Sequence, residues 1–164
     1  KFNVARASSE ALRMNNYDPE IWEREAVHPR EAVKAIRAFL RLHAGLQKTS
    51  AKGKPYNIAL PAGHNINGFD IPMLKLMFER YGEGNSFLPM AFNGIDSLGL
   101  AVAWQQLTGA EVENLKLGTL AEHFGISSDG AHDALSDVRM NIPVARHLLE
   151  GIRAGVTDAA WSVS

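Results

Sequence analysis

The chain has 164 residues, of which 46% are hydrophobic and 21% charged, and this composition is typical of a globular domain with a sizeable core. Its formal net charge of −1 gives no support for nucleic-acid binding by bulk electrostatics, and the absence of cysteine excludes disulfides and thiolate-bound zinc. No apolar run approaches the roughly 20 residues that a membrane-spanning helix needs, so we expect no membrane partner and a cytoplasmic location.

The first part of the chain predicts helices. Ser8 or Ser9 is a suitable N-cap for a short helix, and Asp18 followed by Pro19 is typical of the start of another. Residues 28–46, HPREAVKAIRAFLRLHAGL, have apolar residues at helical spacing and predict a longer helix with a solvated basic face.

The middle of the chain predicts a loop, a strand and a helix. Residues 47–56, QKTSAKGKPY, hold three lysines with a glycine and a proline, and we expect a solvated flexible loop there. Residues 57–63, NIALPAG, predict a short buried strand. The following IPMLKLMFERYG, residues 71–82, predicts a helix that Gly82 ends.

Strands and helices alternate from there on. A strand is expected around residues 92–95, followed by a helix from Ser97 for which Asp96 is a suitable cap, and the last helix is long and contains Pro143. This alternation predicts an α/β sheet with parallel strands. Two strands are few for so many helices, and we therefore expect further strands to precede Lys1.

Asp70 lies where a predicted strand gives way to a predicted helix, and its carboxylate has two interpretations. It is either an ordinary helix N-cap or a metal ligand at the carboxyl end of a strand. Taken alone, the position favours the cap. The large Phe69 beside it is expected to pack in the core rather than to stack on a base.

His132 and Asp137 form the second candidate constellation. On one helix they would be separated by about 500° of rotation, so we expect His132 in a loop and Asp137 in the first turns of the following helix. A surface histidine beside a solvated carboxylate is the alternative. Together with Asp70, however, they are the groups that metal-assisted phosphodiester hydrolysis uses, because Mg²⁺ and Mn²⁺ prefer oxygen ligands and a histidine can act as the base.

Three motifs in this order resemble the DEDDh 3′–5′ exonucleases, a family that includes the proofreading subunit of the bacterial replicative DNA polymerase. They are HNINGFD at 64–70, GIDSLGLA at 94–101 and HDALSD at 132–137, and the intervening ENLKLGTLAEHFGI also matches. The resemblance covers about residues 1–150, and 151–164 is then a C-terminal tail. It implies a ribonuclease H-like mixed sheet flanked by helices.

By this resemblance, Asp70 and Asp137 bind two Mg²⁺ or Mn²⁺ ions and His132 is the general base. His64 and Asn65 are expected near the site, in contact with the substrate. The spacer inside HNINGFD is one residue longer than in the bacterial proofreading subunits and similar to that of the mammalian three-prime repair exonucleases. Association with a DNA polymerase, in replication or repair, is therefore left open.

The family's first motif, an Asp-x-Glu on its first strand, has no counterpart in the sequence. The DPE at 18–20 does not match it, because Pro19 fits a helix start and is unfavourable in a central strand. We expect a segment of roughly 30 residues before Lys1, three strands and their turns, to carry the missing pair. Without it, the protein should be inactive as a nuclease.

The function that these features predict is hydrolysis of terminal phosphodiesters at the 3′ ends of single-stranded DNA, releasing nucleoside 5′-monophosphates. One alternative is an inactive exonuclease-like module that binds nucleic-acid ends or a polymerase. Another is an exoribonuclease that acts on short RNA. The lysines of the predicted loop are candidates for phosphate contacts, but a solvated loop is the preferred interpretation of Lys48, Lys52 and Lys54.

Overall fold

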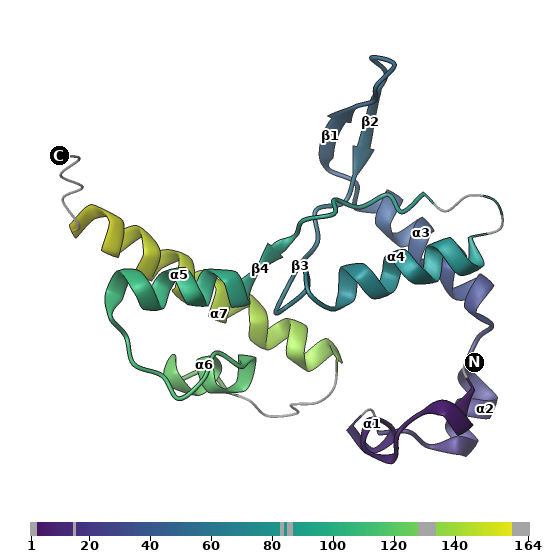
Figure 1. Ribbon diagram of the computed structural model, residues 1–164, viewed down its shortest axis with the longest axis horizontal. Coiled ribbons are helices and arrows are strands. Elements are labelled where there is room, and N and C mark those ends of the chain that lie inside the picture. The colour runs from purple at the N-terminus through teal and green to yellow at the C-terminus, as the bar shows by residue number, and fades with distance from the viewer. Residues whose placement is uncertain (1–2, 15, 83, 85–86, 128–133, 159–164) are drawn as a thin grey trace. The chain divides into compact units, whose positions relative to one another are not determined.

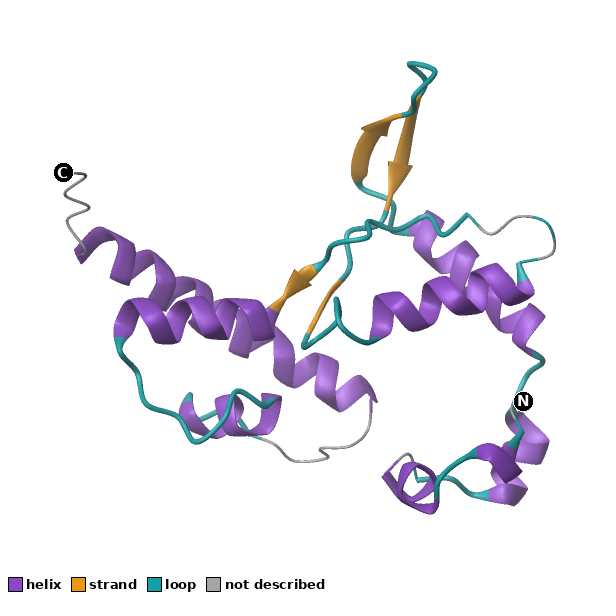
Figure 2. Cartoon of the chain, viewed as in Figure 1, coloured by secondary structure: helices purple, strands orange, loops and turns teal. Residues whose placement is uncertain are grey.

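The structure is a computed structural model that describes residues 3–14, 16–82, 84, 87–127 and 134–158. These residues form a mixed α/β protein in which helices predominate and the strands are short (Figures 1 and 2). The predicted α/β class is therefore confirmed. No helix within the described ranges is both long and apolar enough to cross a membrane.

The chain divides into two compact units that are interleaved along the sequence. The first unit contains Lys1–Pro61 and Asn67–Gly94, and the second contains Ala62–Ile66 and Ile95–Ser164. The first residues of HNINGFD thus belong to the unit that holds the C-terminal helices, whereas its last residues belong to the other unit.

Local capping signals determine where the helices of the first unit begin. These helices are η1 (Val4–Arg6, a 3-10 helix), α1 (Ser9–Met14), α2 (Pro19–Glu25), α3 (Pro29–Leu42) and α4 (Asp70–Tyr81). The Asp18 carboxylate accepts hydrogen bonds from the N–H groups of Glu20 and Ile21 at 2.8 and 3.0 Å, and Pro19 follows it, as predicted. His28 caps α3 by accepting from Arg30 N at 3.2 Å, a role that the sequence did not indicate.

Helices α3 and α4 pack side by side and form the core of the first unit (Figure 1). Val33 and Leu40 are buried on α3, and Ile71 and Phe78 are buried on α4. A spacing of seven residues places each pair on one face of its helix. Helix α4 ends at Tyr81 with Gly82 as its C-cap, as predicted.

Residues 47–56 form a β-hairpin, so the prediction of a flexible loop was wrong. Strand β1 (Leu46–Thr49) pairs antiparallel with β2 (Pro55–Ile58). The turn is closed by Gly53 N donating to the Ser50 carbonyl and by Ser50 N donating to the Lys54 carbonyl, both at 2.9 Å. Gly53 has a φ of 74°, the left-handed conformation that a three-residue hairpin loop requires.

The strand predicted over 57–63 is divided between two sheets. Its first two residues end β2, and Ala59 continues into a parallel bridge with Met90. Its last two form β3 (Ala62–Gly63), which pairs in parallel with β4 (Ile95–Asp96). The predicted parallel pairing is confirmed for β3 and β4. The strand expected around 92–95 is narrower than predicted, because only Ile95 of that range is in β4.

The second unit is built on three helices, α5 (Ser97–Thr108), α6 (Leu117–His123) and α7 (Ala134–Asp158). Helix α7 packs against both α5 and α6. Its core consists of side chains from all three helices: Ala101, Trp104, Leu120, Ala121, Met140, Val144 and Leu148. Helix α6 ends at His123 with Phe124 as its C-cap, and Gly125 follows with a φ of 65°, in the left-handed conformation that often follows a helix end.

The close approach of α5 to α7 occurs at glycines of α7, and the tightest contact is at Gly151. A Cβ atom on Gly151 of α7 would lie 2.5 Å from Cδ1 and 2.7 Å from Nε1 of Trp104. The indole of Trp104, which is 5% exposed, therefore lies directly against the α7 backbone. This contact fixes the position of α7, the helix that carries Asp137.

Candidate active site

His64 follows β3 directly and is joined to α5 and α7 by hydrogen bonds. Its Nδ1 atom lies 2.9 Å from Ser97 Oγ, and Ser97 Oγ donates to Asn141 Oδ1 at 2.6 Å. The hydroxyl of Ser97 is therefore the shared hydrogen-bonding partner of His64 and Asn141. Ser97 is 1% exposed and Asn141 9%, so we call His64, Ser97 and Asn141 the buried relay.

The environment of His64 opposes its protonation. Burial lowers the pKa of the His64 imidazole below its usual value of 6.5, against smaller opposing effects of the Asp96 carboxylate and of a hydrogen bond to the Leu115 backbone. The neutral ring is therefore favoured in the folded protein. A neutral histidine that is held by a serine is suited to positioning, either of the backbone around it or of a substrate.

Asn65 is held by the residue that begins the next helix. The Asp96 Oδ1 atom accepts from Asn65 N at 2.8 Å and from Leu98 N at 3.0 Å, so one oxygen both caps α5 and fixes the motif. The cap that the sequence predicted at Asp96 is confirmed. Asn65 has a φ of 57°, in the left-handed region that asparagine tolerates better than most residues. Its backbone conformation is thus one reason for asparagine at this position.

Asp70 is the first residue of α4 and is exposed, but it does not cap the helix. The N-cap position is occupied by Phe69, and no side-chain hydrogen bond caps the helix there. Within the described ranges, the Asp70 carboxylate has no hydrogen bond and no ion pair. The simple capping interpretation of Asp70 is therefore wrong, and its oxygens are available to a ligand.

Phe69 was predicted to pack in the core, and this prediction was wrong. Its side chain is 61% exposed. Phe69 precedes α4, and the buried face of that helix begins only at Ile71, which is 5% exposed. Phe69, the aromatic residue of the motif, is thus on the surface of its unit, next to Asp70 in the sequence.

Asp137 lies in the first turn of α7 and is half-buried, in the position that the sequence predicted. It is four residues before Asn141, so the two side chains lie on the same face of the helix, one turn apart. Asn141 is a member of the buried relay. The second unit therefore connects the His64 end of HNINGFD to the helix face that carries Asp137.

One predicted site residue is not among those described, and the two predicted metal ligands belong to different units. His132, the expected general base, lies outside the described residues. Asp70 belongs to the first unit and Asp137 to the second, so each carboxylate has its place only within its own unit. Across the described part of the chain, no group of three or more histidine, aspartate and glutamate side chains could hold a metal ion. The oxygen donors of Asp70 and Asp137 suit Mg²⁺ in kind, but they need further ligands.

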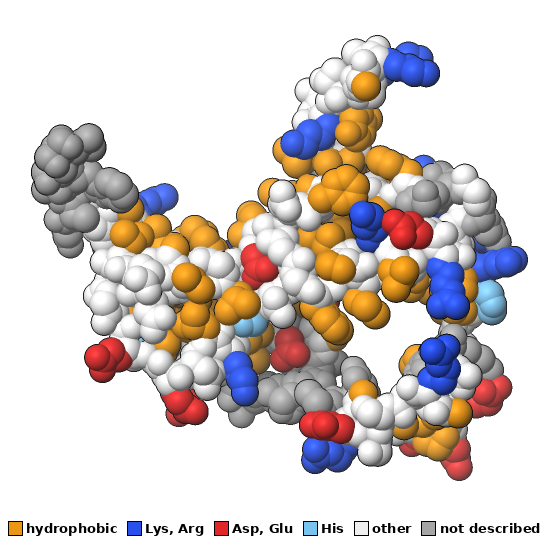
Figure 3. Space-filling view, in the orientation of Figure 1, with side chains coloured by type: hydrophobic (Ala, Val, Ile, Leu, Met, Phe, Trp, Pro, Cys, Tyr) orange, Lys and Arg blue, Asp and Glu red, His pale blue; other side chains and the backbone are white. Residues whose placement is uncertain are grey.

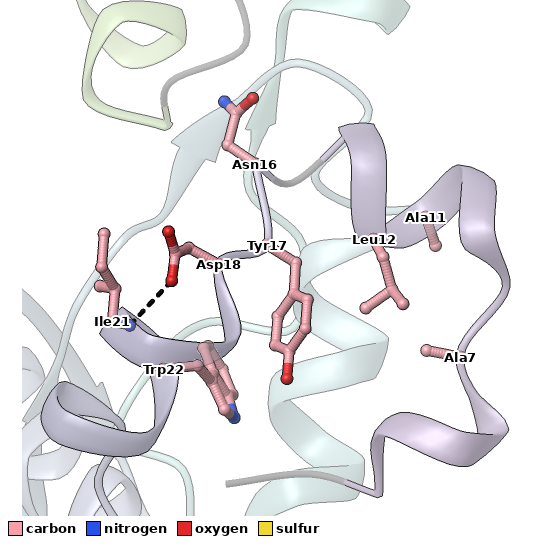
Figure 4. Close-up of a pocket in the computed structure, with 8 residues that line it drawn as sticks. All are labelled: Ala7, Ala11, Leu12, Asn16, Tyr17, Asp18, Ile21 and Trp22. Atoms are coloured by element: carbon pink, nitrogen blue, oxygen red, sulfur yellow. Dashed lines mark hydrogen bonds between the residues drawn. The ribbon is translucent and has the colours of Figure 1, made fainter.

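A pocket of about 400 Å³ lies elsewhere in the first unit, between α1 and α2 (Figure 4). Its walls are mainly apolar and include Tyr17 and Trp22, whose rings are 6.0 Å apart. Its one carboxylate, Asp18, is already bonded to the N–H groups that open α2. The pocket contains none of the predicted site residues.

The structure thus defines a mixed α/β protein whose candidate residues lie at a strand end and at two helix N-termini. Three proteins of Arabidopsis thaliana are similar to it in sequence. Protein NEN4 is 38% identical over 108 residues, protein NEN2 37% over 86 residues and protein NEN3 34% over 106 residues. These matches cover 63%, 52% and 61% of this chain.

The same matches cover only 40% of NEN4, 16% of NEN2 and 20% of NEN3. The similarity therefore concerns one part of each relative. No protein-family model matches the chain, and no solved structure matches it either.

Proposed function

We propose that this chain is the greater part of the catalytic domain of a metal-dependent 3′–5′ exonuclease that acts on single-stranded DNA. The observation that carries the proposal is the buried relay. It connects His64, at the start of one exonuclease-like motif, to the α7 face on which Asp137, the last residue of the other motif, lies one turn away. These residues are far apart in the sequence, and a shared active site would explain why hydrogen bonds connect the segments that carry them.

The two carboxylates are the expected metal ligands. Both lie in the first turn of a helix, where the positive end of the helix dipole favours negative charge. Neither has a hydrogen-bonding or ionic partner among the residues that the structure describes. Mg²⁺ or Mn²⁺ ions bound by Asp70, Asp137 and further carboxylates would stabilise the negative charge that develops on the phosphate and the leaving 3′-oxygen.

The remaining residues have supporting roles in this proposal. His132 accepts the proton of the attacking water. The neutral imidazole of His64 and the fixed backbone of Asn65 line the substrate side of the site. The exposed ring of Phe69, directly before Asp70, is available to the terminal nucleotide as an apolar surface.

Exposed apolar stripes on two helices favour the proposed ribonuclease H-like sheet. On α4, Met73 and Leu76 are each more than half exposed. On α7, the exposed side chains Leu135, Val138 and Ile142 follow the same helical spacing. Helices of an α/β domain bury such stripes against a sheet, and the described strands are too short to cover them. Additional strands carrying the Asp-x-Glu pair fit this requirement.

The test is release of mononucleotides from a single strand labelled at its 3′ end, with the full-length gene product and added Mg²⁺ or Mn²⁺. We expect release that EDTA abolishes and that His132→Ala lowers by about 100- to 10,000-fold, the usual contribution of a general base. Matched DNA and RNA strands distinguish a deoxyribonuclease from an exoribonuclease. Near-normal release by His132→Ala, with the fold intact, would contradict the proposed mechanism.

An inactive binding module is the second candidate, and one observation favours it. The one Asp-x-Glu of the sequence is at residues 18–20, and its Asp18 carboxylate caps α2. The described chain therefore supplies no first motif. If the full-length product binds single strands but releases no nucleotide with either metal, this module replaces the enzyme as the conclusion.

A further inference from the structure

The β1–β2 hairpin has a chemically distinctive face. Lys48 lies directly opposite Tyr56 in the antiparallel register. The hydrogen bonds between Ser50 and Lys54 extend the same ladder by one more pair. Since side chains alternate between the two faces of a strand, Lys48, Lys54 and Tyr56 lie on one face, which we call the hairpin face.

The hairpin is strongly positive for its size. Residues 44–61 contain three lysines, the third being Lys52 in the turn, and no aspartate or glutamate. All three lysines are exposed, and none has an ion pair with a carboxylate in the described part of the chain. Figure 3 accordingly shows blue side chains and no red ones on the visible side of the hairpin. A chain of net charge −1 thus concentrates three positive charges on one element.

An aromatic surface lies among these charges. The Tyr56 ring is 39% exposed and meets the ring of Phe87, which is 48% exposed, at a centroid distance of 6.3 Å and an angle of 69°. Edge-to-face contact of this kind holds a ring in place while leaving one of its faces accessible. Surface lysines do not need an ordered aromatic ring beside them, so the lysines and the ring together indicate more than a solvated positive surface.

The hairpin is also anchored at its base. Ile58 is 6% exposed, and Ala59 N donates to the Pro89 carbonyl at 2.9 Å. The Ala59 carbonyl accepts from Ala91 N at 2.9 Å. A ligand that binds the hairpin face therefore meets an ordered surface, and its binding carries little cost for ordering a loop.

We propose that the hairpin face binds single-stranded nucleic acid. The ammonium groups of Lys48, Lys52 and Lys54 contact successive phosphates, and a base stacks on the ring of Tyr56. Cations beside an exposed aromatic ring match the alternation of phosphate and base along a single strand. An acidic protein surface would satisfy the charges but not use the ring. The inference rests on the proposed function, because the bound strand is the one whose 3′ end is hydrolysed.

The test measures binding without hydrolysis. The full-length protein is titrated in EDTA with a fluorescent oligodeoxythymidine at several salt concentrations, and a triple variant, Lys48→Gln, Lys52→Gln and Lys54→Gln, is compared with it. Each lost phosphate contact lowers the dependence of log affinity on log salt by about 0.7, so we expect the slope to fall by about 2. We also expect Tyr56→Leu to weaken binding about fivefold or more, in line with base–aromatic stacking.

Matched controls make both outcomes decisive. Lys34→Gln removes a lysine of α3 that pairs with Glu31 at 3.0 Å, and it should bind like the wild type. Replacement of all three hairpin lysines by arginine keeps the charge and should keep the affinity. An unchanged salt slope in the folded glutamine variant, or lost binding in the arginine variant, overturns the proposal. Because EDTA prevents hydrolysis, a wild type that binds strands but never releases nucleotides contradicts the enzyme and leaves the hairpin inference standing.

Discussion

His64 and Ser97, 33 positions apart in the sequence, are joined at 2.9 Å between Nδ1 and Oγ. The contact places a partly buried imidazole on a serine whose own proton is used by Asn141. Ser97 is therefore the hydrogen-bonding partner of both other members of the relay. Changes to the relay consequently act on the stability of the second unit as well as on any chemistry at its surface.

Ser97→Ala should destabilise the protein by about 1–3 kcal/mol, because it leaves two groups in a largely buried place, His64 Nδ1 and Asn141 Oδ1, without their partner. The free energy of unfolding from urea denaturation measures this loss. Gln106→Ala changes an exposed residue of the same helix and should remain within about 0.5 kcal/mol of the wild type. Equal stability of the two variants would mean that the relay contributes nothing to folding.

The lowered pKa of His64 predicts a pH dependence of stability. The unfolded chain binds a proton on His64 near the usual value of 6.5, whereas the folded protein does so only at lower pH. The contribution of His64 to stability is therefore complete above pH 6.5 and is lost as the pH falls through the folded pKa. Between pH 7 and pH 5, the wild type should lose more unfolding free energy than His64→Gln.

All other titrating groups are common to those two proteins, so the difference between their pH profiles isolates His64. Parallel profiles over this range would show that burial does not oppose the charged form of the ring. A steeper loss in the variant would reverse the predicted sign.

Gly151→Ala should destabilise the second unit by about 1–3 kcal/mol, the usual cost of overpacking, although alanine is the better helix former. The added methyl group would lie 2.5 Å from Trp104 Cδ1, so either the indole or α7 must move. The near-ultraviolet circular dichroism of the tryptophans reports this movement, and thermal unfolding reports the stability. Gly99→Ala on α5 is the matched control, because its Cβ would meet nothing within 4 Å.

Loss of the charge at Asp70 and loss of the charge at Asp96 should affect the stability of the protein differently. Asp96→Ala removes the cap of α5 and the bond to Asn65, and should cost about 1–2 kcal/mol of stability. Asp70→Asn removes no described contact, so its cost should be clearly smaller than that of Asp96→Ala. If Asp70 binds metal, however, nucleotide release by Asp70→Asn should fall at least about 100-fold.

This pair of variants tests whether Asp70 is a metal ligand or a purely structural carboxylate. Thermal unfolding of each variant is measured beside its exonuclease activity in Mg²⁺. A strongly destabilised Asp70→Asn with normal activity would support a purely structural carboxylate.

The sequence predicted those elements whose signals are local. Asp18 with Pro19, Asp96 and Gly82 each mark a helix boundary within a few residues, and each is where it was expected. The hairpin was missed because a turn with a left-handed glycine, set among lysines and a proline, resembles a loop in composition. Its identity depends on pairing between Leu46 and Ile58, which no short window contains.

Only part of the candidate site could be predicted, again because local signals can be recognised in the sequence and long-range contacts cannot. The place of Asp137 in the first turn of α7 follows from a local helix start. The relay joins residues 33 and 44 positions apart, and no spacing rule relates them. One signal was visible in retrospect: His64 and Ser97 each follow a short strand directly, and adjacent parallel strands end at the same edge. The role of His132 stays a prediction.

The single Oδ1 atom of Asp96 ties Asn65 to Leu98. The two amides share one acceptor oxygen, so a fluctuation that moves the Asp96 side chain breaks both hydrogen bonds. Both amides should therefore open in one cooperative event. Their amide protons should then exchange with deuterium at closely similar rates, although they lie on separate segments. Unwinding the first turn of α5 would thus release the backbone of the histidine–asparagine pair, coupling helix fraying to the shape of the surface that we propose meets the substrate.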